Sequence, residues 1–241
     1  MAPPQISERF CAPDADITIA SSDGVLFKVH RKNLEVHSDI FADAENATHG
    51  DDVDAVVPLS ETAAVLELLF QYMHRQLPPN LHDVDFTTCA GVAEAAEKYW
   101  VYSALNICRM KMKESVKQYP LQVLEYAVRH DHADLAAEAA RQSMGLDVLA
   151  AMESLSPDTF KAWISFREQW HKGARALLAA CVKGFRYKTN DAVLWTLAEC
   201  IQDANPCYNM RSQVEDIITH SADYTQREAL RKLLESRFGD N

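Results

Sequence analysis

Two short segments near the start of the chain carry the β-branched and aromatic residues that favour strands. Residues 17–19 form the first, and in the second, residues 25–29, three apolar side chains alternate with the other two. Asp23-Gly24 between them is a strong signal of a hairpin turn. We therefore predict a β-hairpin over residues 16–30. The residues before it, 1–14, contain three prolines and predict a mobile lead-in.

The next segment has a helical period. Ser38 is a natural N-cap that would divide residues 31–44 into two short helices. Residues 45–54 are small and acidic and predict a solvated loop. A third alternating segment, residues 53–59, predicts a strand. Pro58 indicates that this strand lies at a sheet edge, because proline cannot donate a hydrogen bond to a neighbouring strand.

Longer helical patterns occupy the rest of the chain. One helix is predicted after Ser60 as its cap, and a second over residues 86–117 with a break near residues 99–103. Beyond Pro120 every periodic segment is helical. The expected helices there are 121–130, 133–144, one or two that begin at Ser156-Pro157-Asp158, 191–201, 212–220 and 225–238.

Composition agrees with a helix-rich globular protein. The 241 residues suffice for one or two domains with a sizeable core. Hydrophobic residues make up 48% and charged residues 24%, so general disorder is not expected. Only 7 residues are glycine, which is few for an all-β protein with many tight turns. Helix should dominate.

Charge and hydropathy limit the kinds of partner and the cellular compartment that we expect for this protein. The formal net charge is −11, and such an acidic surface repels nucleic-acid phosphates, so nucleic-acid binding is not expected. No stretch approaches the roughly 20 apolar residues that cross a bilayer, and residues 1–10 lack the features of a signal peptide. The six cysteines form no CxxC pair. We expect an intracellular protein of the cytoplasm or nucleus, without a membrane.

No residue pattern indicates catalysis. The chain contains no nucleophile elbow, phosphate loop or dinucleotide fingerprint, so we predict no enzyme and no catalytic, cofactor-binding or metal-binding residue. His30 ends a predicted strand, where packing is the ordinary role. His130 and His132 have no third or fourth metal ligand nearby in sequence. We therefore favour the interpretation that they belong to the link between two helices and do not bind a metal. One hypothesis that we keep open is an enzyme with an unrecognised helical active site; the two favoured hypotheses follow from a family resemblance described below.

The tryptophans leave two interpretations open. Trp163 and Trp170 lie seven residues apart, on one face of a helix, a spacing that suits both a core and a partner groove. For these two and for Trp195 a place in the core is favoured.

Residues 14–118 resemble the BTB/POZ family. The resemblance begins with the hairpin, whose second strand ends in His30, followed by a leucine and then by Ser38 shortly before Phe41. It continues with a short strand, a long helix that ends in an aromatic pair, and an alanine-rich helix containing Ala96-Glu97-Lys98-Tyr99. Each fragment is weak alone, but their order is specific.

This resemblance implies an α+β fold that is mostly α. A BTB/POZ fold with a small three-stranded sheet flanked by helices is expected over residues 14–118, and an all-helical C-terminal extension over residues 119–241. Residues 1–13 are expected to be a flexible N-terminus. The segments 72–75 and 102–104 are similar to those of BTB proteins from higher fungi.

The function that the resemblance implies is protein–protein interaction. Several BTB domains pair with themselves, and several bind a cullin and deliver substrates to a ubiquitin ligase. We therefore expect a non-catalytic interaction module or scaffold without a cofactor. The alternative is a substrate adaptor of a cullin-type E3 ubiquitin ligase, although no recognisable substrate-binding domain such as a propeller is present.

Two candidate surfaces follow from the resemblance. In self-pairing members, an aspartate at the first strand and a basic residue after the histidine line a charged pocket at the dimer interface. The matching residues are Asp16 and Arg31; alternatively, Asp16 caps a strand turn and Arg31 is solvated. The family's cullin-binding surface corresponds to a second group. Its candidate residues are Val56, Leu59, His74, Leu77, Leu81, Tyr99 and Tyr102.

Overall fold

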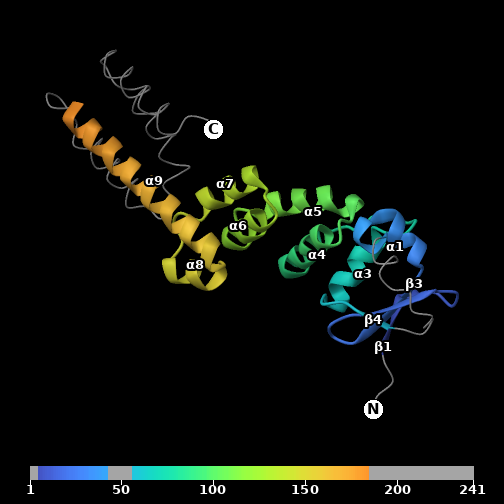
Figure 1. The fold of residues 1–241 in the computed structure, drawn as a ribbon. Helices are drawn as coiled ribbons and strands as arrows, with labels where there is room; N and C mark the ends of the chain where they lie inside the picture. The colour runs from blue at the N-terminus through green and yellow to red at the C-terminus, as the bar shows by residue number, and fades with distance from the viewer. Residues whose placement is uncertain (1–4, 43–55, 185–241) are drawn as a thin grey trace. The chain divides into compact units, whose positions relative to one another are not determined.

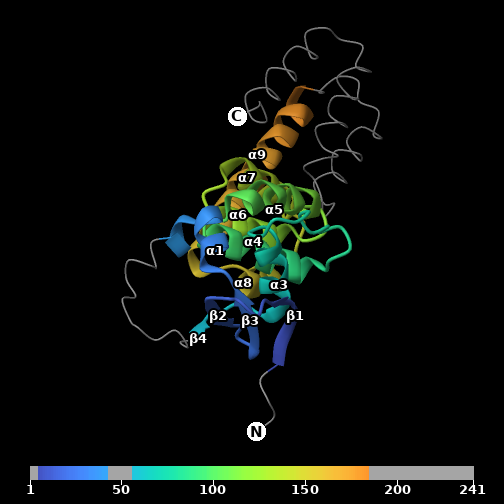
Figure 2. The same cartoon turned by 90° about the vertical axis from the view of Figure 1, so that its right-hand side faces the viewer.

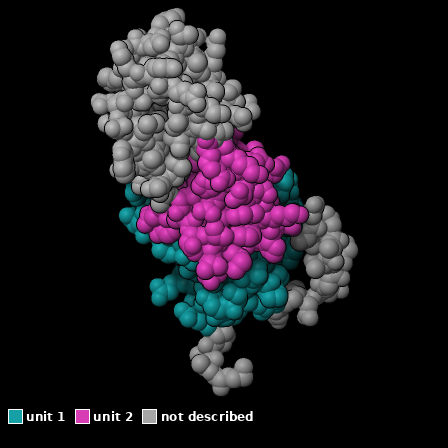
Figure 3. Space-filling model, turned by 90° about the vertical axis from the view of Figure 1, so that its left-hand side faces the viewer, with its two compact units in different colours: residues 1–115 teal, residues 116–241 magenta. Residues whose placement is uncertain are grey.

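The computed structural model describes residues 5–42 and 56–184. The chain divides into two compact units, residues 1–115 and 116–241 (Figure 3). The helices predicted over residues 191–201, 212–220 and 225–238, together with Trp195 and the loop predicted over residues 45–54, lie partly or wholly outside the described residues. The expected domain boundary after residue 118 stays a prediction.

A four-stranded sheet with the order β1-β3-β2-β4 forms one side of the first unit (Figure 1). The predicted hairpin is confirmed: β2 (Ile17–Ala20) and β3 (Val25–Val29) pair antiparallel. Ile19 lies opposite Phe27, and both side chains are fully buried. The turn contains Gly24 at a φ of +87°, a conformation that glycine adopts without strain.

Strand β4 (Val56–Pro58) pairs parallel with β2 and lies at the sheet edge, as predicted (Figure 2). The backbone N–H of Leu59 donates to Ala20 O at 2.8 Å. Because backbone groups alternate in direction along a strand, an N–H at position 58 would point to the open edge. Proline removes that donor.

Strand β1 (Gln5–Cys11) was not predicted, and the expected three-stranded sheet therefore has a fourth strand. It pairs parallel with β3, with an irregular register between Ile6 and Cys11. Phe10 is 5% exposed and packs edge-on against Phe70, with ring centroids 5.7 Å apart. The mobile lead-in predicted over residues 1–14 thus contains an ordered strand, which one buried aromatic side chain holds to the core.

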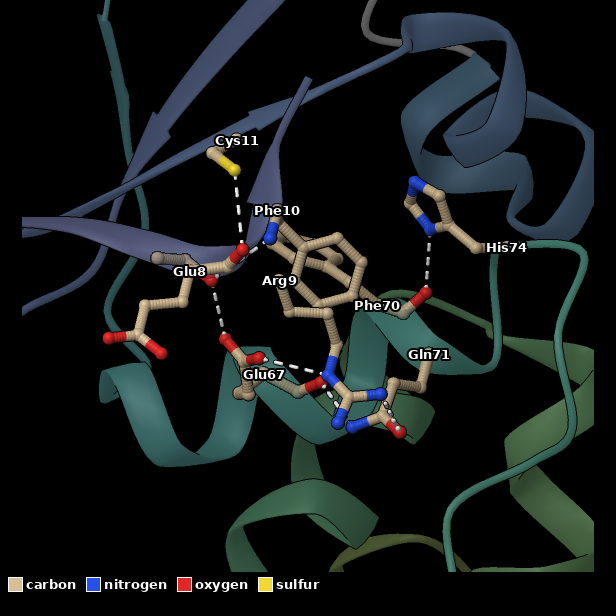
Figure 4. Close-up of polar contacts among 9 residues, drawn as sticks. Glu8, Arg9, Phe10, Cys11, Glu67, Phe70, Gln71 and His74 are labelled. Carbon is tan, nitrogen blue, oxygen red and sulfur yellow. Dashed lines mark hydrogen bonds and ion pairs between the residues drawn. The ribbon is translucent and has the colours of Figure 1, made fainter.

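Polar contacts add to this anchoring (Figure 4). Arg9 of β1 lies over α3 (Ala63–Gln71), where its Nε is 3.3 Å from Glu67 Oε1 and its Nη1 donates to Gln71 Oε1 at 3.2 Å. Ser7 Oγ donates to Glu67 Oε2 at 2.7 Å. The sequence pattern of a single strand does not disclose contacts with a helix sixty residues later.

The helices of the first unit follow the predicted order. Helix α1 (Arg31–His37) ends at Ser38, whose Oγ accepts the Phe41 N–H at 3.3 Å, so the predicted division at Ser38 is confirmed. Helices α4 (Phe86–Lys98) and α5 (Tyr102–Ser115) are separated at the predicted break.

Helix α3 begins later than predicted. Its N-cap is Thr62 rather than Ser60, and Asp23 Oδ1 accepts the N–H of Ala63 at 2.8 Å. A residue of the distant hairpin turn therefore takes the capping role that local sequence assigned to Ser60.

The core of the first unit lies between the sheet and these helices. The large side chains buried at its centre are Ile19, Phe27, Val29, Leu34, Leu66, Leu69, Phe70, Met73, Val92, Val101 and Met112. Helices α3 and α4 approach closely at Gly91, where an added Cβ would lie 2.7 Å from Val65 Cγ2. Only glycine fits that contact without a shift of its neighbour.

The described part of the second unit is helical throughout. Helices α6 (Pro120–Arg129), α7 (Ala133–Gln142) and α9 (Pro157–Gly184) confirm the predicted segments, and α9 is one helix. Helix α8 (Val148–Ser154) was not predicted. At the start of α9, the N–H of Ser156 donates to Glu125 Oε2 at 3.0 Å. A carboxylate of α6 therefore completes the capping of α9.

Candidate partner-binding surfaces

The structure brings Asp16 and Arg31 together. The backbone N–H of Arg31 donates to Asp16 Oδ1 at 2.7 Å. Arg31 is the first residue of α1, whose N-cap His30 makes no side-chain capping bond. The carboxylate of Asp16 therefore caps α1 from the adjacent hairpin. This bond does not involve the guanidinium group, and the interfacial ion pair stays a prediction.

The candidate residues of the second surface differ in exposure. Leu77 is 88% exposed, Tyr102 49% and Val56 47%. Leu81 and Tyr99 are only 5% and 6% exposed. Leu59 and His74 are intermediate. Leu81 and Tyr99 therefore offer almost no contact area to a partner, and the three exposed residues offer the most.

The three exposed residues of this surface lie on three different segments of the first unit. Val56 lies on β4, Leu77 on the connection after α3, and Tyr102 at the start of α5. Within the described residues, no hydrogen bond, ion pair or ring contact joins any two of the seven candidate residues.

Trp100, which lies between α4 and α5, was not among the predicted site residues. Its φ is +50°, in the left-handed region. The N–H of Val101 donates to Ala96 O at 2.9 Å, and that of Trp100 donates to Glu97 O at 3.3 Å. These two bonds define a Schellman motif, whose left-handed position is usually glycine.

Burial of the Trp100 side chain does not offset the free-energy cost of this backbone conformation. A non-glycine residue in the left-handed region costs on the order of 1–2 kcal/mol. The Trp100 side chain is 55% exposed, so packing within the described fold recovers only part of that cost. The fold itself therefore does not require a tryptophan at this position.

Neighbouring residues extend the exposed area around Trp100. Ser38 and Val101 form an isolated antiparallel bridge and are both buried. Beside this bridge, the Tyr102 hydroxyl donates to Asp39, and its ring lies edge-on to Trp100 with centroids 6.4 Å apart. Ile40, next to Asp39, is 44% exposed. We call Asp39, Ile40, Trp100 and Tyr102 the Trp100 surface.

A polar network of Glu61, Lys98 and Tyr99 lies at the end of α4, next to this surface. Glu61 Oε1 lies 2.8 Å from Lys98 Nζ, and the Tyr99 hydroxyl donates to Glu61 Oε2 at 2.7 Å. Burial of the phenol, together with its bond to Glu61, raises the pKa of Tyr99 to about 12. Burial alone would raise the pKa of Glu61, but the hydrogen bonds from Lys98 and Tyr99 outweigh it and the pKa is lowered. Ser38 Oγ also donates to Tyr99 O.

Two histidines of the first unit, His74 and His30, pack against or pair with neighbouring groups. Burial lowers the pKa of His74, whose Nδ1 lies 2.7 Å from Phe70 O and whose ring lies 5.0 Å from that of Phe10. His30 Nε2 is 3.4 Å from Asp14 Oδ1.

His130 and His132 lie on either side of the link between α6 and α7. Their rings lie 5.0 and 5.4 Å from that of Tyr126. Within the described ranges, no group of three or more His, Cys, Asp or Glu side chains is placed to hold a metal ion.

Trp163 belongs to the core of the second unit, as favoured from the sequence. It is 2% exposed, and its Nε1–H donates to Ser143 Oγ at 2.8 Å. Arg167 lies over its ring, 5.5 Å from the centroid. The side chain of Trp170 is intermediate in burial.

The first unit matches a known family. The family model of the BTB/POZ domain matches residues 9–116, a span from β1 to the end of α5. No curated protein matches the chain. Residues 9–116 form a BTB/POZ domain, and the described residues have a small mixed sheet and mostly helical content. BTB/POZ domains mediate protein–protein interactions and dimerisation and are generally non-catalytic.

Across the part of the chain that the structure describes, no helix combines the length and the apolar character needed to cross a membrane.

Proposed function

We propose that this protein is a non-catalytic interaction scaffold of the cell interior, whose BTB/POZ domain binds a protein partner through the Trp100 surface. One observation carries the proposal: a tryptophan occupies a left-handed position that favours glycine, and its side chain is 55% exposed. A residue that costs stability and adds little to the core is explained by a contact outside the chain.

The chemistry of the Trp100 surface suits protein recognition. Tryptophan and tyrosine are enriched among the residues that dominate binding energies at protein interfaces. The bonds from Lys98 and Tyr99 to Glu61 restrain the end of α4, directly before Trp100. Binding to a fixed surface loses less conformational entropy than binding to a mobile one.

The sheet edges do not favour partner binding by strand addition. Pro58 removes a donor from the β4 edge, and the register of β1 is interrupted between Ile6 and Cys11. Both features discourage another strand from pairing. Recognition through side chains around α4 and α5 is the better-supported mode.

The groups with shifted pKa values support a non-catalytic role. Glu61 and Tyr99 are bonded to each other, and the ring of His74 packs against Phe10. Each of these groups joins elements that are distant in sequence. The hypothesis of an unrecognised helical active site receives no support from them.

Adaptor function in a cullin-type ubiquitin ligase is the second candidate. It is favoured by Tyr102, which belongs both to the predicted cullin surface and to the Trp100 surface. Val56 and Leu77 are also exposed on that predicted surface. A homodimer through Asp16 and Arg31 is a further arrangement that the family resemblance supports.

The cullin hypothesis is tested by mixing the full chain with a cullin N-terminal domain and measuring the molar mass by light scattering. A stoichiometric complex that Trp100→Gly abolishes supports the adaptor. The matched control is Met110→Ser, which removes a 65% exposed side chain from α5 outside both candidate surfaces. Absence of a complex at micromolar concentrations rejects the adaptor and leaves self-association, which the molar mass of the chain alone measures.

A further inference from the structure

Helix α8 in the second unit turns apolar side chains toward solvent. Leu149 is 63% exposed and Met152 is 55% exposed. They are three residues apart and therefore lie on the same face of the helix. The opposite face is formed by Ala151 and Leu155, which are fully or nearly fully buried. Leu149 and Met152 are thus not needed to hold α8 in place.

The exposed pair is presented on a helix with a fixed position. Asp147 caps α8, because its Oδ2 accepts the N–H groups of Leu149 and Ala150 at 3.0 and 3.2 Å. At the other end, the N–H of Leu155 donates to Ala151 O at 2.9 Å. Preorganised apolar anchors of this kind bind with a small entropic loss.

The charged residues closest in sequence to this pair are all acidic. Asp147, Glu153 and Asp158 are exposed, and the sequence contains no lysine or arginine between residues 142 and 160. An apolar centre with an acidic rim is complementary to an apolar segment with basic flanks. A second copy of this chain, with a net charge of −11, and an anionic lipid surface are both disfavoured by repulsion.

We propose that the exposed face of α8, made by Leu149 and Met152 with the acidic rim of Asp147, Glu153 and Asp158, binds a basic amphipathic helix of a partner protein. The apolar side chains of that helix cover Leu149 and Met152, and its lysines or arginines face the rim. This site lies in the second unit and is independent of the Trp100 surface.

The test uses the full chain and a fluorescein-labelled synthetic peptide of leucine and lysine, with leucines at helical spacing. A second peptide carries glutamate in place of lysine. Fluorescence anisotropy measures both affinities. The proposal expects the lysine peptide alone to bind, and the double variant Leu149→Ser/Met152→Ser to weaken binding about tenfold or more. Glu153→Gln should weaken it by a smaller factor that shrinks at high salt.

The matched controls are Met110→Ser and Trp100→Gly in the first unit, which should leave peptide affinity unchanged. Thermal melting of each variant checks that it folds. The proposal is overturned if the lysine peptide does not bind, if the glutamate peptide binds equally well, or if Leu149→Ser/Met152→Ser binds as the original chain does. A dimer of the full chain that this double variant dissociates would also overturn it, because the occupant would then be a second copy.

Discussion

Asp16 Oδ1 accepts the backbone N–H of Arg31 at 2.7 Å, so an aspartate before the first hairpin strand caps the helix that follows the second. The family resemblance assigns the same two residues to a dimer interface. Both roles are compatible, because the bond within the chain involves the main chain of Arg31 and not its guanidinium group. The side chains of Asp16 and Arg31 should therefore contribute differently to the stability of the fold.

Replacing Asp16 by alanine should lower the free energy of unfolding by about 1 kcal/mol, the usual effect of losing a helix cap. Arg31→Ala keeps the backbone donor and should change that free energy by less than about 0.5 kcal/mol. Urea denaturation followed by far-ultraviolet circular dichroism measures both. Equal losses in the two variants would show that the arginine side chain is part of the contact.

Glu125 should make the second unit sensitive to acid. Burial tends to raise its pKa, but the bonds from Ser156, Thr159 and Arg129 prevail, so its pKa lies below the ordinary value of 4.5. A lowered pKa means that the ionised form stabilises the fold above about pH 4.5, and that this contribution disappears as the pH falls through the folded-state value.

The variant Glu125→Gln should accordingly lose about 1 kcal/mol at pH 7, and this difference from the original chain should shrink below pH 4.5. Urea titrations at several pH values, followed by tryptophan fluorescence, measure the difference. Glu153→Gln, on the exposed side of α8, is the matched control and should have little effect. A loss for Glu125→Gln that does not depend on pH would refute the ionic contribution.

Gly91→Ala should destabilise the first unit by about 1–2 kcal/mol, although alanine is the better helix former, because the new methyl group overlaps Val65 Cγ2. Val65→Ala removes the obstacle. The double variant should therefore be more stable than the sum of the single losses by about 0.5 kcal/mol or more. Strict additivity in thermal unfolding would contradict the proposed contact.

Tyr72→Phe should leave the stability unchanged or raise it by up to about 1 kcal/mol. The Tyr72 hydroxyl is buried and has no hydrogen-bond partner among the residues that the structure describes, and burial raises its pKa well above the usual range. Removing a buried polar atom that has no partner removes a desolvation cost. Chemical denaturation of the two proteins tests this, and a clear loss of stability would show that the hydroxyl has a partner in solution.

The sequence was informative where one face of an element is buried. The hairpin and the helices α4 to α7 were predicted because their apolar periods and turn signals agree with their tertiary contacts. The division at Ser38 could be read from the local chemistry of an N-cap. These are places where local preference and global packing point to the same structure.

The features that the sequence did not predict depend on contacts between residues that are distant in the sequence. Strand β1 is held mainly by Phe10 and by Arg9 on α3, and α3 begins where Asp23 of the hairpin turn can cap it. Leu81 and Tyr99 lie in stretches predicted to face a partner, yet both are buried. Periodicity does not reveal whether a residue between helices turns inward.

Trp100 was missed because a Schellman motif is usually recognised by its glycine, and here a tryptophan occupies that position. The signal available in the sequence was the predicted break at residues 99–103, which contains no glycine. A helix break of this kind is a place to look for an exposed and functional residue.

The most direct test of the Trp100 surface is the molar mass of the full chain by light scattering, alone over a range of concentrations and with a cullin N-terminal domain. We expect a mass above the 27.1 kDa of one chain in at least one of the two experiments. Trp100→Gly should restore the monomer mass while keeping or raising the melting temperature, because glycine adopts the left-handed conformation without strain. A chain that stays monomeric in both experiments, or an assembly that Trp100→Gly leaves intact, would contradict the proposal.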